Sequence, residues 1–223
     1  MIKDNIASIR KRIAASCFRA GRDPSSVKIV AVSKASGIEE IREAVSCGIT
    51  DIGENKVQEA LQKNYELRFT DYGLRIKWHM VGHLQRNKVK DAVRIFDLIH
   101  SVDSLRLAEK IDAEAGKISK VQDILLEIKT SPEAAKSGLS AQEAGEVVEK
   151  IADLKNIRLN GFMTIAPAVN NPEEARPYFR MLKDLRDKIN DLRHLSMGMT
   201  DDFEIAIEEG ADIIRVGRGV FGS

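Results

Sequence analysis

The stretch VKIVAVSK, from Val27 to Lys34, is a short apolar run rich in valine, which is typical of a strand buried on both faces. Seven further short runs with strand character follow it along the chain. The eight expected strands cover residues 28–33, 50–54, 76–82, 96–102, 122–129, 159–166, 193–198 and 212–217. Strands that alternate regularly with helices predict a closed parallel (β/α)8 barrel of the TIM type, with an open doubly wound sheet as the alternative.

Amphipathic stretches with helical spacing fill the gaps between these strands. The expected helices are Ile38 to Cys47, Lys56 to Phe69, Arg86 to Val93, Leu105 to Ala115, Ala141 to Ala152, Pro172 to Leu192 and Asp202 to Glu209. An additional N-terminal helix is predicted by an apolar stripe with spacings of three and four, formed by Ile2, Ile6, Ile9, Ile13 and Cys17. Gly21 and Pro24 are expected to end it. We expect one domain over residues 1–223.

Composition narrows the class of protein. The chain has 223 residues, of which 31% are charged, and its 35 Lys and Arg balance 34 Asp and Glu, so no global charge attracts nucleic acid or an anionic membrane. The only two cysteines, Cys17 and Cys47, form no metal-binding pair. The N-terminus lacks the continuous apolar core of a secretory signal, and no run is long enough to span a membrane. We therefore expect a cytoplasmic protein.

Two features at strand ends suggest chemistry. Lys34 closes the first strand, where its stem can be held by the core and burial can favour the neutral, nucleophilic amine that Schiff-base formation requires. The seventh and eighth strands run into SMGMTDDF (residues 196–203) and VGRGVFGS (residues 216–223). In (β/α)8 barrels these two loops frequently bind phosphate, and their glycines allow backbone N–H groups to approach an anion.

Other motifs are excluded on closer reading. Gly217, Gly219 and Gly222 match GxGxxG, but a dinucleotide fingerprint must open a helix and precede an acidic residue, for which we expect no room before Ser223. His79 and His83 are four residues apart without an HExxH pattern, which favours a hydrogen-bonded or pocket-lining role over a metal site. His100 and His194 indicate nothing by themselves.

Seven segments together resemble a known family, the pyridoxal phosphate homeostasis proteins, which are single-domain relatives of the N-terminal barrel of alanine racemase. The resemblance covers nearly the whole chain in the right order. The segments are VAVSK (30–34), IGENKVQE (52–59), WHMVGHLQRNK (78–88), IHSVDS (99–104), KSGLS (136–140), GFMTIA (161–166) and LSMGMTDDFEIAIEEG (195–210) with IIRVGRGVFG (213–222).

The resemblance implies a cofactor and a set of site residues. Lys34 would hold pyridoxal 5′-phosphate as an internal aldimine, and Arg215 would face its pyridine nitrogen. The hydroxyl of Thr200 and the backbone amides of Gly217 and Arg218 would hold the phosphate, and Asn55 would lie near the cofactor. The expected ligand is thus pyridoxal phosphate, with no metal.

Three positions depart from the family pattern. Thr200 stands where serine is frequent, which keeps the hydroxyl, whereas Arg218 stands where threonine is usual, so a hydroxyl is lost. The Arg218 guanidinium could compensate or point to solvent. Lys129 stands where asparagine is common, and Lys136 could be a secondary cofactor contact or a solvated loop lysine.

Three functions remain open at this point: a carrier or regulator of pyridoxal phosphate, a racemase-like enzyme that uses it, and a barrel that uses Lys34 on another phosphorylated metabolite. The carrier is favoured, because we expect no C-terminal β-domain of the kind that completes the racemase active site. The expected partners are pyridoxal phosphate and apo forms of enzymes that depend on it, and we expect a monomer.

Overall fold

The computed structural model describes residues 1–68, 76–131, 137–189 and 192–222. Its eight strands pair in parallel and in chain order, and β8 pairs with β1 to close the barrel. The strands are β1 Lys28–Val32, β2 Asp51–Glu54, β3 Lys77–Met80, β4 Leu98–Val102, β5 Gln122–Glu127, β6 Ile157–Met163, β7 His194–Ser196 and β8 Ile213–Val216. The predicted (β/α)8 barrel with an N-terminal helix is confirmed.

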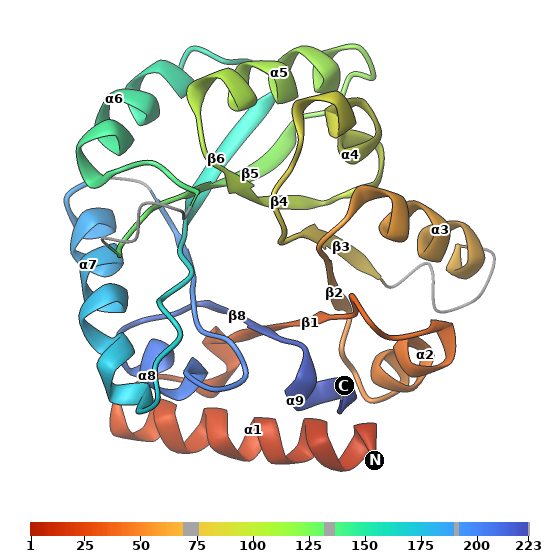
Figure 1. The fold of residues 1–223 in the computed structure, drawn as a ribbon, viewed down its shortest axis with the longest axis vertical. Helices are drawn as coiled ribbons and strands as arrows, with labels where there is room; N and C mark the ends of the chain where they lie inside the picture. The colour runs from red at the N-terminus through yellow and green to blue at the C-terminus, as the bar shows by residue number, and fades with distance from the viewer. Residues whose placement is uncertain (69–75, 132–136, 190–191, 223) are drawn as a thin grey trace.

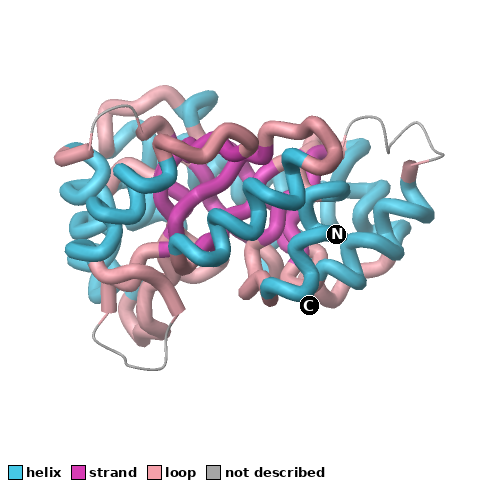
Figure 2. Tube along the Cα trace, turned by 90° about the horizontal axis from the view of Figure 1, so that it is seen from above, coloured by secondary structure: helices cyan, strands magenta, loops and turns pink. Residues whose placement is uncertain are grey.

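Helices surround this ring of strands, as Figure 1 shows, and the strands lie at the centre when the molecule is turned (Figure 2). The α-helices are α1 Ile2–Arg19, α2 Ile38–Ser46, α3 Val57–Leu67, α4 Val89–Ile95, α5 Leu105–Gly116, α6 Ala141–Ile151, α7 Arg176–Asp187, α8 Phe203–Glu208 and α9 Arg218–Phe221. Short 3-10 helices are η1 Pro24–Ser26, η3 Arg86–Lys88 and η4 Pro172–Ala175.

The N-terminal helix α1 packs against the outside of the barrel. Its apolar stripe is buried as expected, and α1 contacts α8 and α9, which belong to the other end of the chain (Figure 1). The side-chain amide of Asn5 also donates a hydrogen bond to the carbonyl of Val220 at 3.0 Å. The helix therefore joins the first and the last segments of the barrel.

Several boundaries differ from the sequence-based expectation. Strand β6 begins two residues earlier and ends three residues earlier than expected. The segment after Asn171 starts as η4, because the Asn171 side chain caps a 3-10 turn before α7 begins. A further helix, α9, was not expected at all. Phe69 and residues 190–191 of two expected helices lie outside the described residues.

The barrel wall has two apolar faces. The larger cluster lies between the strands and the helices and includes Phe96, Phe162 and Phe179, all fully buried. The smaller cluster lies inside the barrel and contains Val30, Val81, Leu98, Leu125, Met163 and Ile213. Because side chains alternate along a strand, Phe162 and its neighbour Met163 belong to different clusters. Among the described residues, no helix is both long and apolar enough to cross a membrane.

Candidate ligand site at the carboxyl ends of the strands

One cavity of about 580 Å³ gathers all six residues that the sequence singled out. Arg215 lies on β8 and the other five come from the segments after β1, β2, β7 and β8; they meet because parallel strands end on the same face of a barrel. The six residues that line it are Lys34, Asn55, Thr200, Arg215, Gly217 and Arg218. Val32, Val81, Gly82 and Ile165 add apolar and backbone surface.

Lys34 does not lie as expected. Strand β1 ends at Val32, so Lys34 belongs to the loop beyond the strand, and the residue is exposed. The expectation that the core buries this lysine is therefore wrong. Lys34 instead lines the cavity as an exposed residue.

The residue before Lys34 is tied to a buried ion pair. The Ser33 hydroxyl donates to Oε1 of Glu54 at 2.5 Å, and the Lys63 ammonium lies 2.6 Å both from that oxygen and from the Ser33 carbonyl. Glu54 is fully buried, and its Oε2 has no hydrogen-bond partner among the described residues. Sequence analysis missed Glu54 and Lys63, although the position of Glu54 inside a buried strand was a usable signal.

Asn55 is placed by a close approach of two backbones. A Cβ atom on Gly82 would lie 2.4 Å from the Asn55 carbonyl oxygen, so only glycine fits at that position. The Gly82 carbonyl in turn accepts a hydrogen bond from the Ser101 hydroxyl at 2.5 Å. The loops after β2 and β3 are thus held together at the cavity wall.

The two glycine loops proposed from the sequence do meet. The Gly219 backbone N–H donates to the Thr200 hydroxyl at 3.3 Å, which links the loop after β7 to the loop after β8. Gly198 has a φ of +90°, and its chain turn is held by a 2.6 Å hydrogen bond from the Met199 N–H to Asp202. Gly217 caps α9, so the Arg218 N–H opens a helix and has no partner within it.

Arg215 lies on β8 with its side chain inside the barrel and is only 4% exposed. One terminal nitrogen donates to the carbonyl and to the hydroxyl of Ser196, each at 2.7 Å, and the other donates to the Thr164 carbonyl at 2.8 Å. Two of its five N–H groups have no partner in the described part of the chain. Burial lowers the pKa of Arg215 to about 10, so the group stays cationic at neutral pH.

Arg218, three residues later, differs from Arg215 both in exposure and in its partner. Its side chain is 67% exposed, and its guanidinium lies 2.6 Å from Asp201, which is 75% exposed. The side chain is thus largely exposed, and in this structure its guanidinium is paired with Asp201. It forms an ion pair across the rim, between the same two glycine loops.

Lys129 does not line the main cavity. Lys129 lines a neighbouring cavity of about 320 Å³, which shares Val81, Gly82 and Ile165 with the main one. Lys136 lies outside the described residues.

The histidines take hydrogen-bonded positions. His79 is buried inside the barrel between Asp51 and His100, which is the hydrogen-bonded role that the sequence favoured. His83 is mostly exposed and lies 3.4 Å from Asp103. In the described ranges, no group of three or more His, Cys, Asp or Glu side chains is arranged to hold a metal ion.

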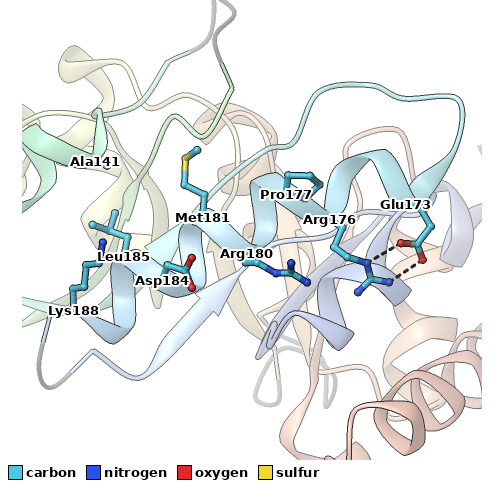
Figure 3. Close-up of a pocket in the computed structure, with 9 residues that line it drawn as sticks. All are labelled: Ala141, Glu173, Arg176, Pro177, Arg180, Met181, Asp184, Leu185 and Lys188. Carbon is cyan, nitrogen blue, oxygen red and sulfur yellow. Dashed lines mark hydrogen bonds and ion pairs between the residues drawn. The ribbon is translucent and has the colours of Figure 1, made fainter.

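A second depression, of about 500 Å³, lies on the outer surface along α7 (Figure 3). Its most prominent cation, Arg176, is already within hydrogen-bond distance of Glu173, Glu208 and Glu209. Its second arginine, Arg180, is likewise bound to Glu209, so both guanidinium groups are occupied and we do not assign a ligand site to the depression.

Fold and cavity together define a class: a (β/α)8 barrel with a lysine, a buried arginine and two linked glycine loops around a cavity at the carboxyl ends of its strands. The model of the alanine racemase N-terminal domain matches residues 2–223. A pyridoxal phosphate homeostasis protein of Aquifex aeolicus is 42% identical over 98% of this chain and 96% of its own length. The protein of that name from Pseudomonas aeruginosa is 37% identical over 100% and 95%. The chain belongs to this family.

Solved structures agree. PipY of Synechococcus elongatus, in a structure with pyridoxal phosphate bound, is 35% identical over the full length of both chains, with a TM-score of 0.86. A protein of unknown function from Bifidobacterium adolescentis has a TM-score of 0.93 at 37% identity, over 99% of this chain and 94% of that one. An alanine racemase of Clostridium difficile, at 15% identity and a TM-score of 0.73, shares the fold; this chain covers 56% of it.

Proposed function

We propose that this protein binds pyridoxal 5′-phosphate in the cavity at the carboxyl ends of its strands and serves as a carrier or regulator of that cofactor. The observation that carries the proposal is the meeting of Lys34, Arg215 and the two Thr200-linked glycine loops around one cavity. Relatives named as pyridoxal phosphate homeostasis proteins and the PipY structure with pyridoxal phosphate bound support it.

The donor set of the cavity suits this cofactor. Pyridoxal phosphate supplies an aldehyde that reacts with amines and an aromatic ring that withdraws electrons. The cavity offers a primary amine on Lys34, and Arg215 has two N–H groups that face no described protein acceptor. A guanidinium only donates hydrogen bonds, so Arg215 would meet a ring nitrogen that accepts one and would not hand it a proton readily.

The phosphate would lie between the two glycine loops. The Thr200 hydroxyl accepts from the Gly219 N–H, which leaves its own hydrogen available to an anion. The Gly217 and Arg218 amides lie at the start of α9, where backbone N–H groups suit negative charge. Asn55, which lines the same cavity, would also contact the cofactor.

Lys34 would attach the cofactor covalently through its amine. Because the residue is exposed, the amine can be reached from solvent, and the cofactor can enter and leave without a rearrangement of the core. Such access suits exchange with apo forms of enzymes that need pyridoxal phosphate, and it does not suit a reaction that must exclude water. We further propose a cytoplasmic, single-domain monomer without racemase turnover.

The test is reduction with borohydride in the presence of pyridoxal phosphate, followed by peptide mapping. In the unmodified protein the reduced adduct should map to Lys34, and Lys34→Ala should abolish it, although weak noncovalent binding can persist. Lys129→Ala is the matched control, because Lys129 lines the adjacent cavity, and it should leave the adduct intact. Mapping mainly to Lys129 or Lys136 would contradict the assignment.

The carrier function has its own test. Incubation of the loaded protein with each L-amino acid should yield no D-isomer beyond the amount of protein present. Sustained racemisation that disappears in Lys34→Ala would overturn the carrier function in favour of the enzyme.

A further inference from the structure

A line of polar side chains crosses the otherwise apolar interior of the barrel. It starts at Asp51, the first residue of β2, and passes through His79 on β3, His100 on β4 and Ser196 on β7 to Arg215 on β8. Four hydrogen bonds connect the five residues. They are Asp51 Oδ1 to His79 Nε2 at 2.9 Å, His79 Nδ1 to His100 Nε2 at 2.9 Å, His100 Nδ1 to Ser196 Oγ at 2.8 Å, and Ser196 Oγ to Arg215 at 2.7 Å.

The line runs from one end of the barrel to the other. Asp51 lies at the amino ends of the strands, where it contacts Lys28 at 3.2 Å and lines a separate cavity of about 520 Å³. Arg215 lines the ligand cavity at the carboxyl ends. The residues between them are at most 2% exposed, so water does not interrupt the connection.

The two ends of the line fix where its protons lie. Arg215 can only donate, so the Ser196 oxygen accepts from it and the Ser196 hydroxyl is free to donate to Nδ1 of His100. His100 is then protonated on Nε2 and donates to Nδ1 of His79, which in turn donates from Nε2 to Asp51. Every donor has an acceptor when both rings are neutral and Asp51 is ionised.

The reverse arrangement is less favourable. A doubly protonated His79 would donate to His100, and His100 would donate from Nδ1 to Ser196, whose own hydrogen would then lack an acceptor among the described residues. It would also add a second buried cation near Arg215, while Asp51 is already balanced by Lys28. Burial, together with the charge of Arg215, holds the pKa of His100 well below its usual value, which agrees with a neutral ring.

We propose that Asp51, His79, His100 and Ser196 form a directed hydrogen-bond chain. This chain positions Arg215 for the ligand of the cavity at the carboxyl ends of the strands. Asp51, at the opposite end of the barrel, is thus a positioning residue for a site that it does not touch. The hydrogen-bond chain holds one guanidinium nitrogen in place, the Thr164 carbonyl accepts from the other, and two N–H groups of this cavity-lining arginine keep no acceptor among the described residues. The direction of the hydrogen-bond chain does not depend on any ligand. Its effect on ligand binding rests on the proposed function.

The direction is tested by nitrogen-15 NMR of the histidine rings in the full-length protein without added cofactor. We expect His79 and His100 each to be neutral and protonated on Nε2 at neutral pH. A doubly protonated His79 with His100 protonated on Nδ1 would overturn the proposal. This measurement needs no ligand, so it decides the chain even if pyridoxal phosphate fails to bind.

The positioning effect is tested with three variants, each titrated with pyridoxal phosphate and compared in absorption spectrum. Ser196→Ala removes the link to Arg215 and should weaken binding roughly tenfold, whereas Asp51→Asn removes the distant charge and should weaken it roughly threefold and shift the absorption of the bound cofactor. Asp123→Asn is the control. Asp123 also lies near the amino end of a strand, but it pairs with Arg158 and takes no part in the hydrogen-bond chain.

Thermal unfolding first shows whether each variant is folded, so that a loss of affinity is distinguished from a loss of structure. If Asp51→Asn matches Asp123→Asn in both affinity and spectrum, Asp51 does not position the site. If Asp51→Asn fails to fold, Ser196→Ala carries the same test one link closer to the cavity, and an unchanged affinity there would overturn the proposal. If the unmodified protein binds no pyridoxal phosphate, the proposed function fails while the NMR result still stands.

Discussion

The two faces of the barrel wall are built from the same strands but have different chemistry. The outward face packs against the helices with large apolar side chains such as Phe162, and its cluster extends around the whole molecule. The inward face has a small apolar cluster that includes Met163, and beside it a chain of polar and charged groups from Asp51 to Arg215. The outer layer contributes most of the apolar burial, whereas the inner layer pairs its polar groups with one another.

This difference shows how one barrel can separate stability from function. A buried polar group is costly unless its hydrogen bonds are made, so an interior chain of five such groups requires that almost every donor meets an acceptor. Substitutions on the outward face should therefore change the free energy of unfolding, and substitutions along the inward face or at the cavity should change ligand binding.

The largest effect is expected outside the barrel. Phe162→Ala removes a fully buried ring from the layer between β6 and the helices and should lower the free energy of unfolding by about 3–5 kcal/mol. Urea denaturation measures this loss. The affinity of the folded fraction for pyridoxal phosphate should stay within about threefold of the unmodified value; a larger loss would mean that the two faces are not separate.

The second-largest effect is the contribution of Asp51 to the free energy of unfolding, which should depend on pH. Burial raises the pKa of this carboxyl, but the hydrogen bond from His79 and the nearby Lys28 ammonium outweigh it, so the pKa falls from 3.8 to about 2. Because the folded-state pKa is depressed, the contribution to stability is present above about pH 4 and is lost as the pH falls toward 2. It should amount to on the order of 2 kcal/mol.

Unfolding measured across this pH range in the unmodified protein and in Asp51→Asn isolates that contribution. The difference in free energy of unfolding between the two proteins should shrink as the pH falls. A difference that stays constant down to pH 2 would show that the Asp51 charge is not what stabilises the fold.

The third effect is on the affinity for pyridoxal phosphate, at the two linked glycine loops. Thr200→Val keeps the shape of the side chain but removes the hydroxyl that links the two glycine loops, and affinity for pyridoxal phosphate should fall roughly tenfold. Equilibrium titration provides the measurement. Unchanged affinity would place the phosphate elsewhere, and unchanged thermal stability of the variant would confirm that any loss arises in the ligand-bound state.

The smallest effect is expected at the rim. Arg218→Ala breaks an ion pair whose two partners are largely exposed, so the free energy of unfolding should change by less than about 1 kcal/mol. Affinity for pyridoxal phosphate should change less than about threefold, since the backbone amide of residue 218 is retained. Titration in parallel with Thr200→Val makes the comparison, and a larger loss in Arg218→Ala would show that its guanidinium contacts the ligand.

Much of the fold follows from the order of apolar runs. The stripe from Ile2 to Cys17 predicted α1, and eight alternating strands predicted closure, because both features depend on local periodicity. The boundary errors have local causes as well. Asn171 caps a 3-10 turn that sequence reads as the start of an α-helix, and α9 is one turn, too short to show a period.

The site was partly predictable. The sequence correctly brought Lys34 and the two glycine loops to one cavity, because strand order alone brings the strand ends to one face. The interior chain was not predictable, since His79, His100 and Ser196 meet only through the register of three separate strands. The exposure of Lys34 was also missed, because β1 ends two residues before it and a strand end is the least certain feature of an apolar run.

The pairing of β8 with β1 has a consequence for synthesis on the ribosome. Lys34 follows the first strand and Arg215 lies on the last. These two residues of the same cavity are therefore synthesised early and late in translation, respectively. The pairing between these strands is the most non-local contact of the ring, and such contacts form late because the intervening chain must be closed first. The cavity is therefore completed only when β8 has joined β1, and a nascent chain that lacks β8 and the segment after it lacks Arg215, Gly217 and Arg218 of the cavity wall.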